Sequence, residues 1–366
     1  MIKRFLLLLA ITLIACTAVE AQDFTKSDTL RYVDATQFRI INNGFDDPLY
    51  SRLPKYMEDS VRDGLWWLAR CSAGIGIRFA TDSRCVAMHY NIRNQFHMAH
   101  MADTGTKGVD LYILDEDDGK WHFVNCNRPT KDSIQTKVFI DRLDGRMHEY
   151  LAYLSLYDGV NWIDIGVDST AVLTMPQVVS PRVGGKVVFY GTSIMQGGCA
   201  TRPGMVSTNI LQRELGVECV NLGFSGQAKM DSCMARVMAA IPDVAAYVLD
   251  PVPNCTKMMC DTLTYGFVNI LRTLRPDVPI IMVEGPMYSY TKYSAYYSSY
   301  LPEKNVEWRK NYERLLADNP DNLYYVDCEG LYGPDGEGFV DGIHATDVGF
   351  LYYAAKLLPV LKQVIK

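Results

Sequence analysis

Residues 187–193 read VVFYGTS, an apolar run that leads directly into a turn containing Gly191 and Ser193. A short apolar run rich in β-branched and aromatic residues, followed by a glycine, is typical of a buried strand. A buried strand that ends in such a turn can present a serine hydroxyl at the edge of a sheet. The segment therefore predicts a strand and turn that place Ser193 where a nucleophile is needed.

From this strand to the C-terminus, strand-like and helical segments alternate. Strand-like runs occur at residues 187–190, 219–222, 245–249, 280–283 and 323–326, and helical stretches at 206–215, 231–240, 261–274, 304–317 and 347–364. Alternating strands and helices predict a mostly parallel sheet with helices on both faces. In such sheets ligands bind beyond the carboxyl ends of the strands, so we expect the site there.

The first half of the chain has a different pattern. Short β-rich runs lie at residues 75–80, 85–92, 109–114, 121–124, 137–140 and 149–156. Residues 116–119 between two of them form a hairpin turn by type. Several short strands at this spacing predict a β-sandwich or jelly roll.

The chain length and a Pro- and Gly-rich segment suggest where the two halves divide. A chain of 366 residues exceeds the size at which single cores usually stop growing, about 250–300 residues. A Pro- and Gly-rich break occupies residues 180–185. We therefore predict a β domain over 22–182 and an α/β domain over 183–366.

The N-terminus predicts export. Lys3 and Arg4 precede an apolar run at 5–14 that is too short to span a bilayer. Small residues favour cleavage before Gln22, which makes 1–21 a signal peptide. Residues 13–16 also resemble a lipoprotein box in which Cys16 carries the lipid. The mature protein is thus expected to be periplasmic or secreted, or else anchored at the cell surface or outer membrane.

Composition narrows the possible partners. The chain is 48% hydrophobic and 21% charged, as in soluble globular proteins, and its net charge is −6. A negative chain without Lys/Arg clusters argues against nucleic acid or an anionic membrane as partner. Nine cysteines remain after removal of the signal, and no C-x-x-C spacing indicates zinc. Buried apolar cysteines, with at most one or two disulfides, are expected.

Candidate catalytic groups follow four of the predicted strands. Ser193 follows the first, Gly226 lies in a glycine-containing loop after the second, and Asn254 ends a proline-stiffened loop after the third. His344 is the one histidine in the second half, and Asp341 precedes it by three residues. Acyl transfer needs a nucleophile, a base and fixed donors around an oxyanion, and these residues can supply each.

The order and spacing of these residues resemble the four sequence blocks of the SGNH (GDSL-type) hydrolases. The resemblance implies a flavodoxin-like three-layer α/β/α domain. It implies Ser193 as nucleophile, His344 as base and Asp341 as the group that orients the histidine. It assigns the oxyanion hole to the Ser193 and Gly226 backbone N–H groups and the Asn254 side chain, with no cofactor or metal.

Two departures and one further motif accompany this resemblance. Thr192 stands where the family usually has aspartate, and residues 250–254, DPVPN, replace the usual Gly-x-Asn-Asp. Both affect substrate preference more than chemistry, because the reacting groups remain. Residues 108–112, GVDLY, resemble the motif of the GxDLY domain that precedes one SGNH subgroup. This predicts a two-domain exported bacterial esterase.

Three other patterns have competing interpretations. His89, His97 and His100 could suggest a metal site, but positions three apart on a strand point to opposite faces, so a solvated or core role is favoured. Asp115 to Asp118 could suggest calcium, although a hairpin turn is simpler. The tyrosine-rich stretch 287–300 suits stacking on sugars, or packing on the neighbouring domain.

The sequence as a whole predicts an exported serine esterase. We expect it to remove short acyl groups, most plausibly acetyl, from an acylated carbohydrate. A lipid or thioester acylhydrolase is the alternative within the same class. A non-catalytic glycan-binding protein is the alternative from another class.

Overall fold

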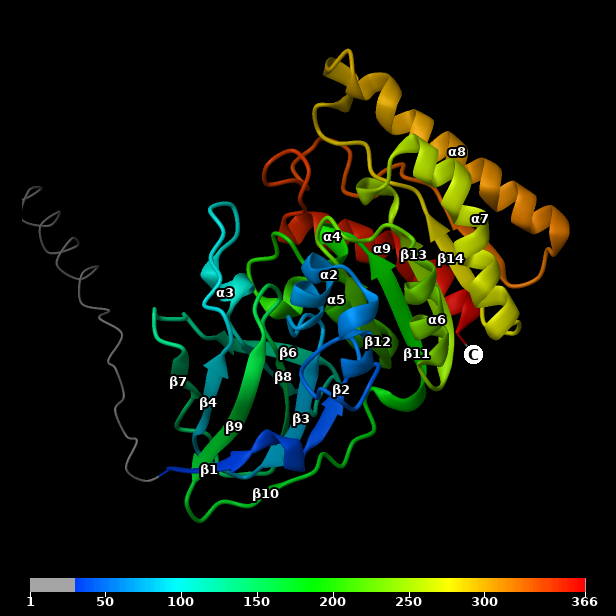
Figure 1. The fold of residues 1–366 in the computed structure, drawn as a ribbon. Coiled ribbons are helices and arrows are strands. Elements are labelled where there is room, and N and C mark those ends of the chain that lie inside the picture. The colour runs from blue at the N-terminus through cyan, green and yellow to red at the C-terminus, as the bar shows by residue number, and fades with distance from the viewer. Residues whose placement is uncertain (1–29, 366) are drawn as a thin grey trace, which may run out of the picture.

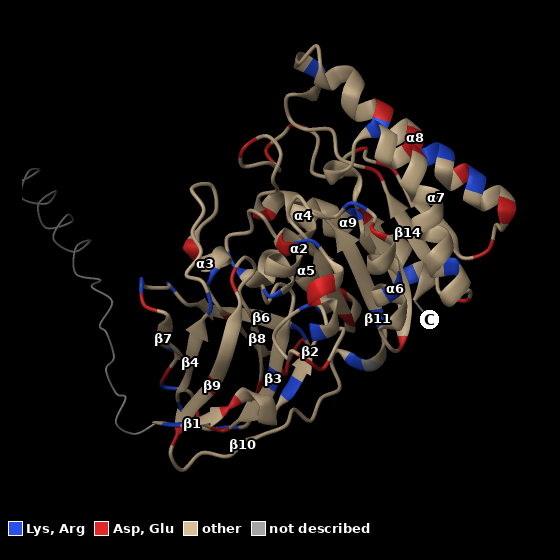
Figure 2. Ribbon diagram, in the orientation of Figure 1, with Lys and Arg blue, Asp and Glu red and all other residues tan. Residues whose placement is uncertain are grey.

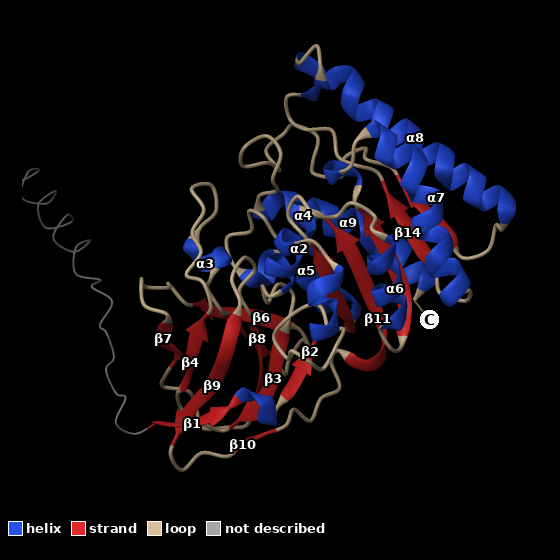
Figure 3. Cartoon of the chain, viewed as in Figure 1, coloured by secondary structure: helices blue, strands red, loops and turns tan. Residues whose placement is uncertain are grey.

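The computed structural model describes residues 30–365 and contains two β-rich layers beside a larger α/β layer stack (Figure 1). The predicted signal segment 1–21, with Cys16, lies outside the described residues. Antiparallel sheets fill the first half of the described chain, and a parallel sheet flanked by helices fills the second (Figure 3). The expected change of architecture between the halves is confirmed.

The parallel sheet has the strand order β12-β11-β13-β14-β15. Its strands are β11 (Arg182–Gly191), β12 (Val217–Gly223), β13 (Val244–Asp250), β14 (Ile280–Val283) and β15 (Leu323–Val326). All neighbours pair in parallel. The first strand in sequence lies second in the sheet, so the connections diverge between β11 and β13. Loops from these strands surround that switch point, where ligands bind in doubly wound sheets.

Two helical layers cover this sheet. Helices α5 (Ser207–Leu215) and α9 (Asp347–Val364) share one hydrophobic cluster with it, and α6 (Ser232–Ala240), α7 (Lys257–Leu274) and α8 (Tyr297–Asp318) share the other. Helix α7 begins four residues before the predicted start, because Thr256 caps it by accepting from Met259 N–H. Helix α8 begins seven residues early, because Pro302 lies inside the helix rather than before it.

The first half forms two antiparallel sheets around a shared core. One has the order β1-β9-β4-β7, and the other β10-β3-β8-β5-β6 with β2 beside β3. The strands are β1 (Leu30–Asp34), β2 (Arg39–Ile41), β3 (Gly76–Thr81), β4 (Val86–Ile92), β5 (Asp110–Leu114), β6 (Trp121–Cys126), β7 (Ile134–Ile140), β8 (His148–Tyr153), β9 (Val160–Asp168) and β10 (Leu173–Thr174). The β5–β6 hairpin is confirmed, with Asp115 N–H donating to Lys120 across the turn.

Four of these strands were not predicted. Strand β9 reads VNWIDIGVD, in which Gly166 and two aspartates lower the strand propensity. Strands β1, β2 and β10 are only two to five residues long and lie at sheet margins. The jelly-roll connectivity of the β domain stays a prediction.

The first half packs closely on the α/β half. The short helix α2 (Asp63–Ala69) places Leu65, Trp66 and Leu68 in the same hydrophobic cluster as α6 and α7. Asn42 binds the edge strand β12: its N–H donates to Glu218 at 3.0 Å, and its side chain accepts from Cys219 N–H at 3.0 Å. The first half thereby covers an edge that would otherwise expose unpaired backbone groups.

Surface charge is mixed on the outer helices. Lys/Arg and Asp/Glu residues alternate along the outward side of α8 (Figure 2). In the described part of the chain, no helix combines the length and the apolar character needed to cross a bilayer. All nine cysteines that the structure describes have free thiols.

Candidate active site

The turn after β11 places Ser193 at the start of a short helix. Strand β11 ends at Gly191, and Ser193 is the first residue of α4 (Ser193–Gln196). A Cβ on Gly191 would lie 2.7 Å from the Met195 Cβ, so this turn requires glycine. Helix α4 ends at Gly197, whose φ of 114° reverses the chain. The predicted strand and turn are therefore present.

Three of the predicted residues form a continuous hydrogen-bonded chain. The Ser193 Oγ lies 3.0 Å from His344 Nε2, although the two residues are 151 positions apart. His344 Nδ1 lies 2.8 Å from Asp341 Oδ2. Asp341 Oδ1 also accepts from the backbone N–H groups of His344 (2.7 Å) and Ile343 (3.0 Å). The arrangement has the geometry of a nucleophile, a base and an orienting carboxylate.

Asp341 is held as a carboxylate. Partial burial acts to raise its pKa, but the hydrogen bonds from His344 and Ile343 outweigh this and lower the pKa to about 2. An ionised Asp341 accepts the Nδ1–H proton of a neutral imidazole. Nε2 is then the unprotonated nitrogen, and it faces the serine hydroxyl as a proton acceptor.

The predicted oxyanion donors lie at the carboxyl ends of adjacent strands. As the first residue of α4, Ser193 has a backbone N–H without an intrahelical acceptor. Gly226, with φ of 68°, follows β12 in a turn closed by Gln227 N–H donating to Phe224 C=O. Asn254 follows β13, and its Oδ1 accepts from Ala228 N–H at 3.3 Å, which leaves Nδ2 as the donor end of the amide.

The two departures from the family pattern are both buried. Thr192 is fully buried, and its hydroxyl has no hydrogen-bond partner among the described residues. Asp250 is also buried and accepts from Tyr353 O–H at 3.1 Å. Burial raises the pKa of Asp250 well above its usual value. Neither residue belongs to the chain of reacting groups.

Residues that the sequence analysis missed support the nucleophile. Tyr157, from the first half, donates its hydroxyl proton to the Ser193 carbonyl at 3.0 Å. Gln196 is fully buried, donates to Leu156 C=O and accepts from Ser225 N–H, each at 3.1 Å. It therefore joins α4 to the Gly226 loop and to the first half.

Arg52, also from the first half, supports the loop that contains Gly226. Its buried guanidinium donates to the carbonyls of Gly223 and Asn221, at the end of β12, and stacks on Phe224. Burial lowers the pKa of Arg52 to about 10. A single arginine 170 residues before this loop carries no sequence signal of such a role.

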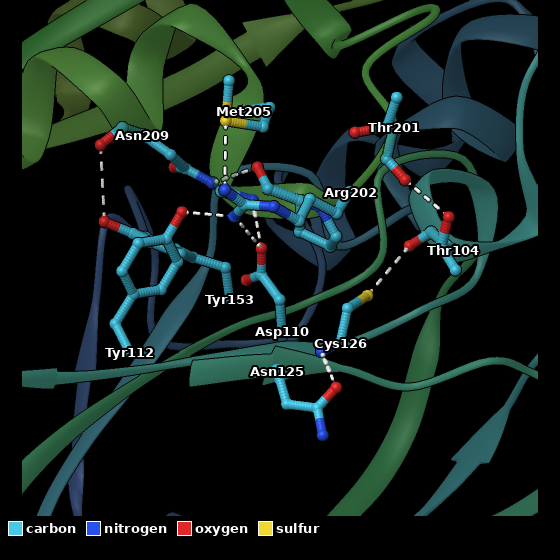
Figure 4. A network of polar contacts seen from close by, with 12 residues as sticks. Thr104, Asp110, Tyr112, Asn125, Cys126, Tyr153, Thr201, Arg202, Met205 and Asn209 are labelled. Carbon is cyan, nitrogen blue, oxygen red and sulfur yellow. Dashed lines mark hydrogen bonds and ion pairs between the residues drawn. The ribbon is translucent and has the colours of Figure 1, made fainter. Parts of the chain in front are cut away.

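The GVDLY segment of the first half binds the chain that follows α4 (Figure 4). Asp110 is completely buried and accepts from Arg202 Nη1 at 3.0 Å and from Gly204 N–H at 2.8 Å. The Tyr112 hydroxyl contacts the same guanidinium. Thr104 donates to Thr201 C=O at 2.6 Å. The motif therefore fastens the β-rich half to the segment directly after the candidate nucleophile.

Two histidines of the first half, His97 and His100, do not lie as expected. His97 and His100 were predicted to lie on a strand and to point in opposite directions, and this placement is wrong. Both lie in the loop between β4 and α3 (Asp103–Thr106). Asp158 ends the strand by accepting from the N–H groups of Asn94 and Phe96. His97 contacts Asp103, whereas the His100 ring lies 5.4 Å from the His344 ring.

The tyrosine-rich stretch borders a cavity beside the base loop. Its rings pack mainly on one another, for example Tyr290 on Tyr297 and Tyr296 on Tyr300. Together with residues 327–336, the stretch lines a cavity of about 980 Å³. Ser289 N–H donates to Gly342 C=O, which places the cavity wall next to Asp341.

The fold and the hydrogen-bonded chain from Ser193 to Asp341 define a class, the two-domain α/β proteins built like serine hydrolases. Residues 185–362 match the GDSL-like lipase/acylhydrolase family, and residues 30–173 match the GxDLY domain, the N-terminus of SGNH-hydrolase-type esterases. A crystal structure of a GDSL-like lipase from Bacteroides ovatus is 30% identical, with a TM-score of 0.86, over 92% of this chain and 98% of that one. The chain belongs to the GDSL-like lipase/acylhydrolase family with a GxDLY N-terminal domain.

More distant structures share the fold. The salicylyl-acyltransferase SsfX3 from a tetracycline biosynthetic pathway is 15% identical, with a TM-score of 0.74, over 93% of this chain and all of that one. An acetyl xylan esterase from Butyrivibrio proteoclasticus is 12% identical, with a TM-score of 0.57, over 92% and 98% of the two chains. No curated protein sequence matches the chain.

Proposed function

We propose that the protein is an exported serine esterase that removes short acyl groups, chiefly acetyl, from a carbohydrate. The observation that carries the proposal is the chain from Ser193 Oγ through His344 to Asp341, with separations of 3.0 and 2.8 Å. In this proposal residues 1–21 are removed as a signal peptide, or Cys16 is lipidated. Residues 22–182 form a jelly-roll-like domain and 183–366 a flavodoxin-like hydrolase domain.

The proposed reaction has two stages. Ser193 Oγ attacks the ester carbonyl carbon while its proton passes to His344 Nε2, and the carbonyl oxygen becomes an oxyanion beside the Ser193, Gly226 and Asn254 donors. Collapse breaks the bond to the sugar oxygen, which takes the proton from His344. Water then attacks the acyl-enzyme with His344 again as base, releasing the carboxylic acid and restoring Ser193.

Two observations support a carbohydrate ester. One of the proteins that share this fold is an acetyl xylan esterase. The cavity beside the base loop is lined by Tyr288, Tyr293 and Tyr332 with polar groups such as Glu284 and Arg309. Aromatic rings with polar neighbours suit the apolar faces and hydroxyl groups of sugars.

A chain-length series of chromogenic esters tests the proposal. Wild type should hydrolyse the acetate ester and lose activity by the octanoate, and acetylated xylan should release acetate. Ser193→Ala should release none. Activity that rises with acyl length would favour a lipid acylhydrolase. Glycan binding without hydrolysis of any ester would favour the non-catalytic alternative.

A further inference from the structure

A soft-ligand cluster lies against the proposed base. His100, Cys199 and His344 each direct one ligand atom into a common region, and these three atoms lie within 4.8 Å of one another. The residues come from three separate segments: the loop before α3, the loop after α4, and the loop before α9. His100 is exposed, Cys199 is 4% exposed, and His344 is half-buried.

Hydrogen bonds join the three segments that carry this cluster. Cys199 N–H donates to the carbonyl of Ala345, the residue after His344, at 3.0 Å. Two residues on, Thr201 N–H donates to the Asp347 side chain at 2.9 Å, so the Cys199 segment is bonded both to the base loop and to the start of α9. Thr104, close to His100, donates to Thr201 C=O at 2.6 Å. These bonds hold the backbones of the three segments next to one another.

The ligand set suits a borderline or soft metal ion such as zinc. Two imidazoles and a thiolate bind zinc in tetrahedral sites whose fourth position holds water, at about 2.0–2.1 Å for nitrogen and about 2.3 Å for sulfur. Ligand atoms in such a site lie roughly 3.3–3.8 Å apart, as tetrahedral geometry at these bond lengths requires. The three ligand atoms lie within 4.8 Å of one another, so metal binding requires a small inward rotation of these side chains.

The base is already prepared as a metal ligand. Metal-bound histidines almost always donate their other ring N–H to a carboxylate, a backbone carbonyl or water, which fixes the tautomer and raises ligand basicity. Asp341 occupies that position on Nδ1 of His344, at 2.8 Å. The nitrogen left for a metal is Nε2, which in this structure contacts Ser193 Oγ.

We propose that His100, Cys199 and His344 form a zinc-binding site, and that zinc bound there switches off the hydrolase. Binding forms one bond from each ligand to Zn²⁺, and the Cys199 thiol releases its proton to solvent. Zinc on Nε2 replaces the hydrogen bond to Ser193, so the serine has no base. The binding site stands independently of the reaction, whereas its inhibitory effect rests on the proposed function.

Direct binding is tested with Co²⁺, whose bond to a thiolate gives an ultraviolet charge-transfer band. The full-length Ser193→Ala protein, which has no nucleophile to compete for Nε2, is titrated with Co²⁺ and then with Zn²⁺. A thiolate band should grow to one equivalent and disappear as zinc displaces cobalt. When Cys199→Ser is added to Ser193→Ala, the thiolate band should be absent. When His100→Ala is added instead, the band should need at least about tenfold more Co²⁺.

A histidine and a cysteine outside the cluster provide matched controls. His97→Ala removes an exposed histidine of the same loop that contacts Asp103 instead, and Cys233→Ser removes a partly exposed thiol outside the cluster. Both should keep the band. A band that survives Cys199→Ser, or no band in the parent protein, would overturn the site. Cys199→Ala serves as a second variant if Cys199→Ser does not fold.

Inhibition is measured separately, on a chromogenic acetate ester, with each rate divided by the same variant's rate without zinc. Zinc should inhibit wild type, and EDTA should restore full turnover. His100→Ala and Cys199→Ser should need at least about tenfold more zinc for half inhibition, whereas His97→Ala should match wild type. Equal sensitivity of all variants would refute the inhibitory role. If wild type hydrolyses no ester, the proposed function fails and the cobalt titration still decides the site.

Discussion

The serine hydroxyl at position 193 is positioned by groups from both halves of the chain. His344 accepts a hydrogen bond from the Ser193 hydroxyl, and Tyr157 donates a hydrogen bond to the Ser193 carbonyl. Two backbone N–H groups of the same loop fix Asp341, and Asp341 in turn holds the His344 imidazole. Because each hydrogen bond restrains the next, the reacting groups are arranged before any substrate binds.

Removing either reacting group should disable the same step. Ser193→Ala and His344→Ala should each lower kcat by on the order of 10⁶, as in serine triads, and the double variant should lose little more. Steady-state hydrolysis of an acetate ester measures this, with circular dichroism confirming the fold. Single losses that add in free energy would show that the two residues do not act together.

Asn254→Ala should affect the transition state rather than binding. Because Oδ1 accepts from Ala228 N–H, Nδ2 is the end of the amide that we propose as an oxyanion donor. Loss of one such donor lowers kcat by roughly 10²–10³ with little change in KM. Full kinetic curves on the acetate ester separate the two constants. A change in KM alone would instead make Asn254 a ground-state binding residue.

The ionisation of Asp341 should be visible in stability. Its pKa in the folded protein is about 2, below the usual 3.8, so folding favours the carboxylate. The stabilisation is complete above about pH 4 and is lost as the pH falls through about 2. We expect the melting-temperature gap between wild type and Asp341→Asn to narrow as the pH falls below about 4. A gap that widens below pH 4 would contradict this assignment.

At the scale of single elements, local patterns predicted most of the α/β half. Strands β14 and β15 and helix α9 have the predicted bounds, because apolar runs and a capping Thr346 define them locally. The His97–His100 loop was misplaced, because Asp158, some 60 residues later, ends the strand before it. Tyr157, Arg52 and Gln196 were missed for the same reason, since their partners lie far away in sequence.

The GVDLY motif gives a prediction for an element interface. Asp110→Ala would leave Arg202, one-fifth exposed, and the Gly204 N–H without their buried acceptor. Breaking a buried pair from one side costs about 3–5 kcal/mol, which urea unfolding measures. Glu303→Ala, which breaks the exposed pair with Lys257, is the matched control and should change little. Equal effects of the two changes would argue against a docking role for the motif.

At the scale of the whole molecule, the two halves share hydrophobic cores. One cluster joins Leu53, Leu65 and Trp66 to the helices on one face of the parallel sheet. Another joins Met101 and Leu156 to the opposite face, around α5 and α9. The β-rich half thus contributes to both sides of the sheet. Sequence periodicity does not reveal this, because each half also has a complete pattern of its own.

Separating the halves should therefore destabilise the α/β half itself. A fragment of residues 183–366 would expose the apolar surface that Leu53, Leu65, Trp66 and Leu68 now cover, and would lose Arg52 from the Gly223 carbonyl. Exposed apolar patches of this kind promote aggregation. We expect the isolated fragment to aggregate, or to melt well below the full-length protein, and to turn over even a small acetate ester poorly.

A cleavage site inserted in the full-length protein at residues 175–180, directly before β11, provides the control. After cleavage the halves should stay associated through Asp110–Arg202 and the shared clusters, and keep turnover on both acetate ester and acetylated xylan. Size-exclusion chromatography shows the association, and thermal melting compares stability. Activity would then not require the covalent link between the halves. It would still require the contact between them, because that contact holds α4 and the Gly226 loop in place. A monomeric 183–366 fragment with full-length melting temperature and full activity on both substrates would contradict this dependence.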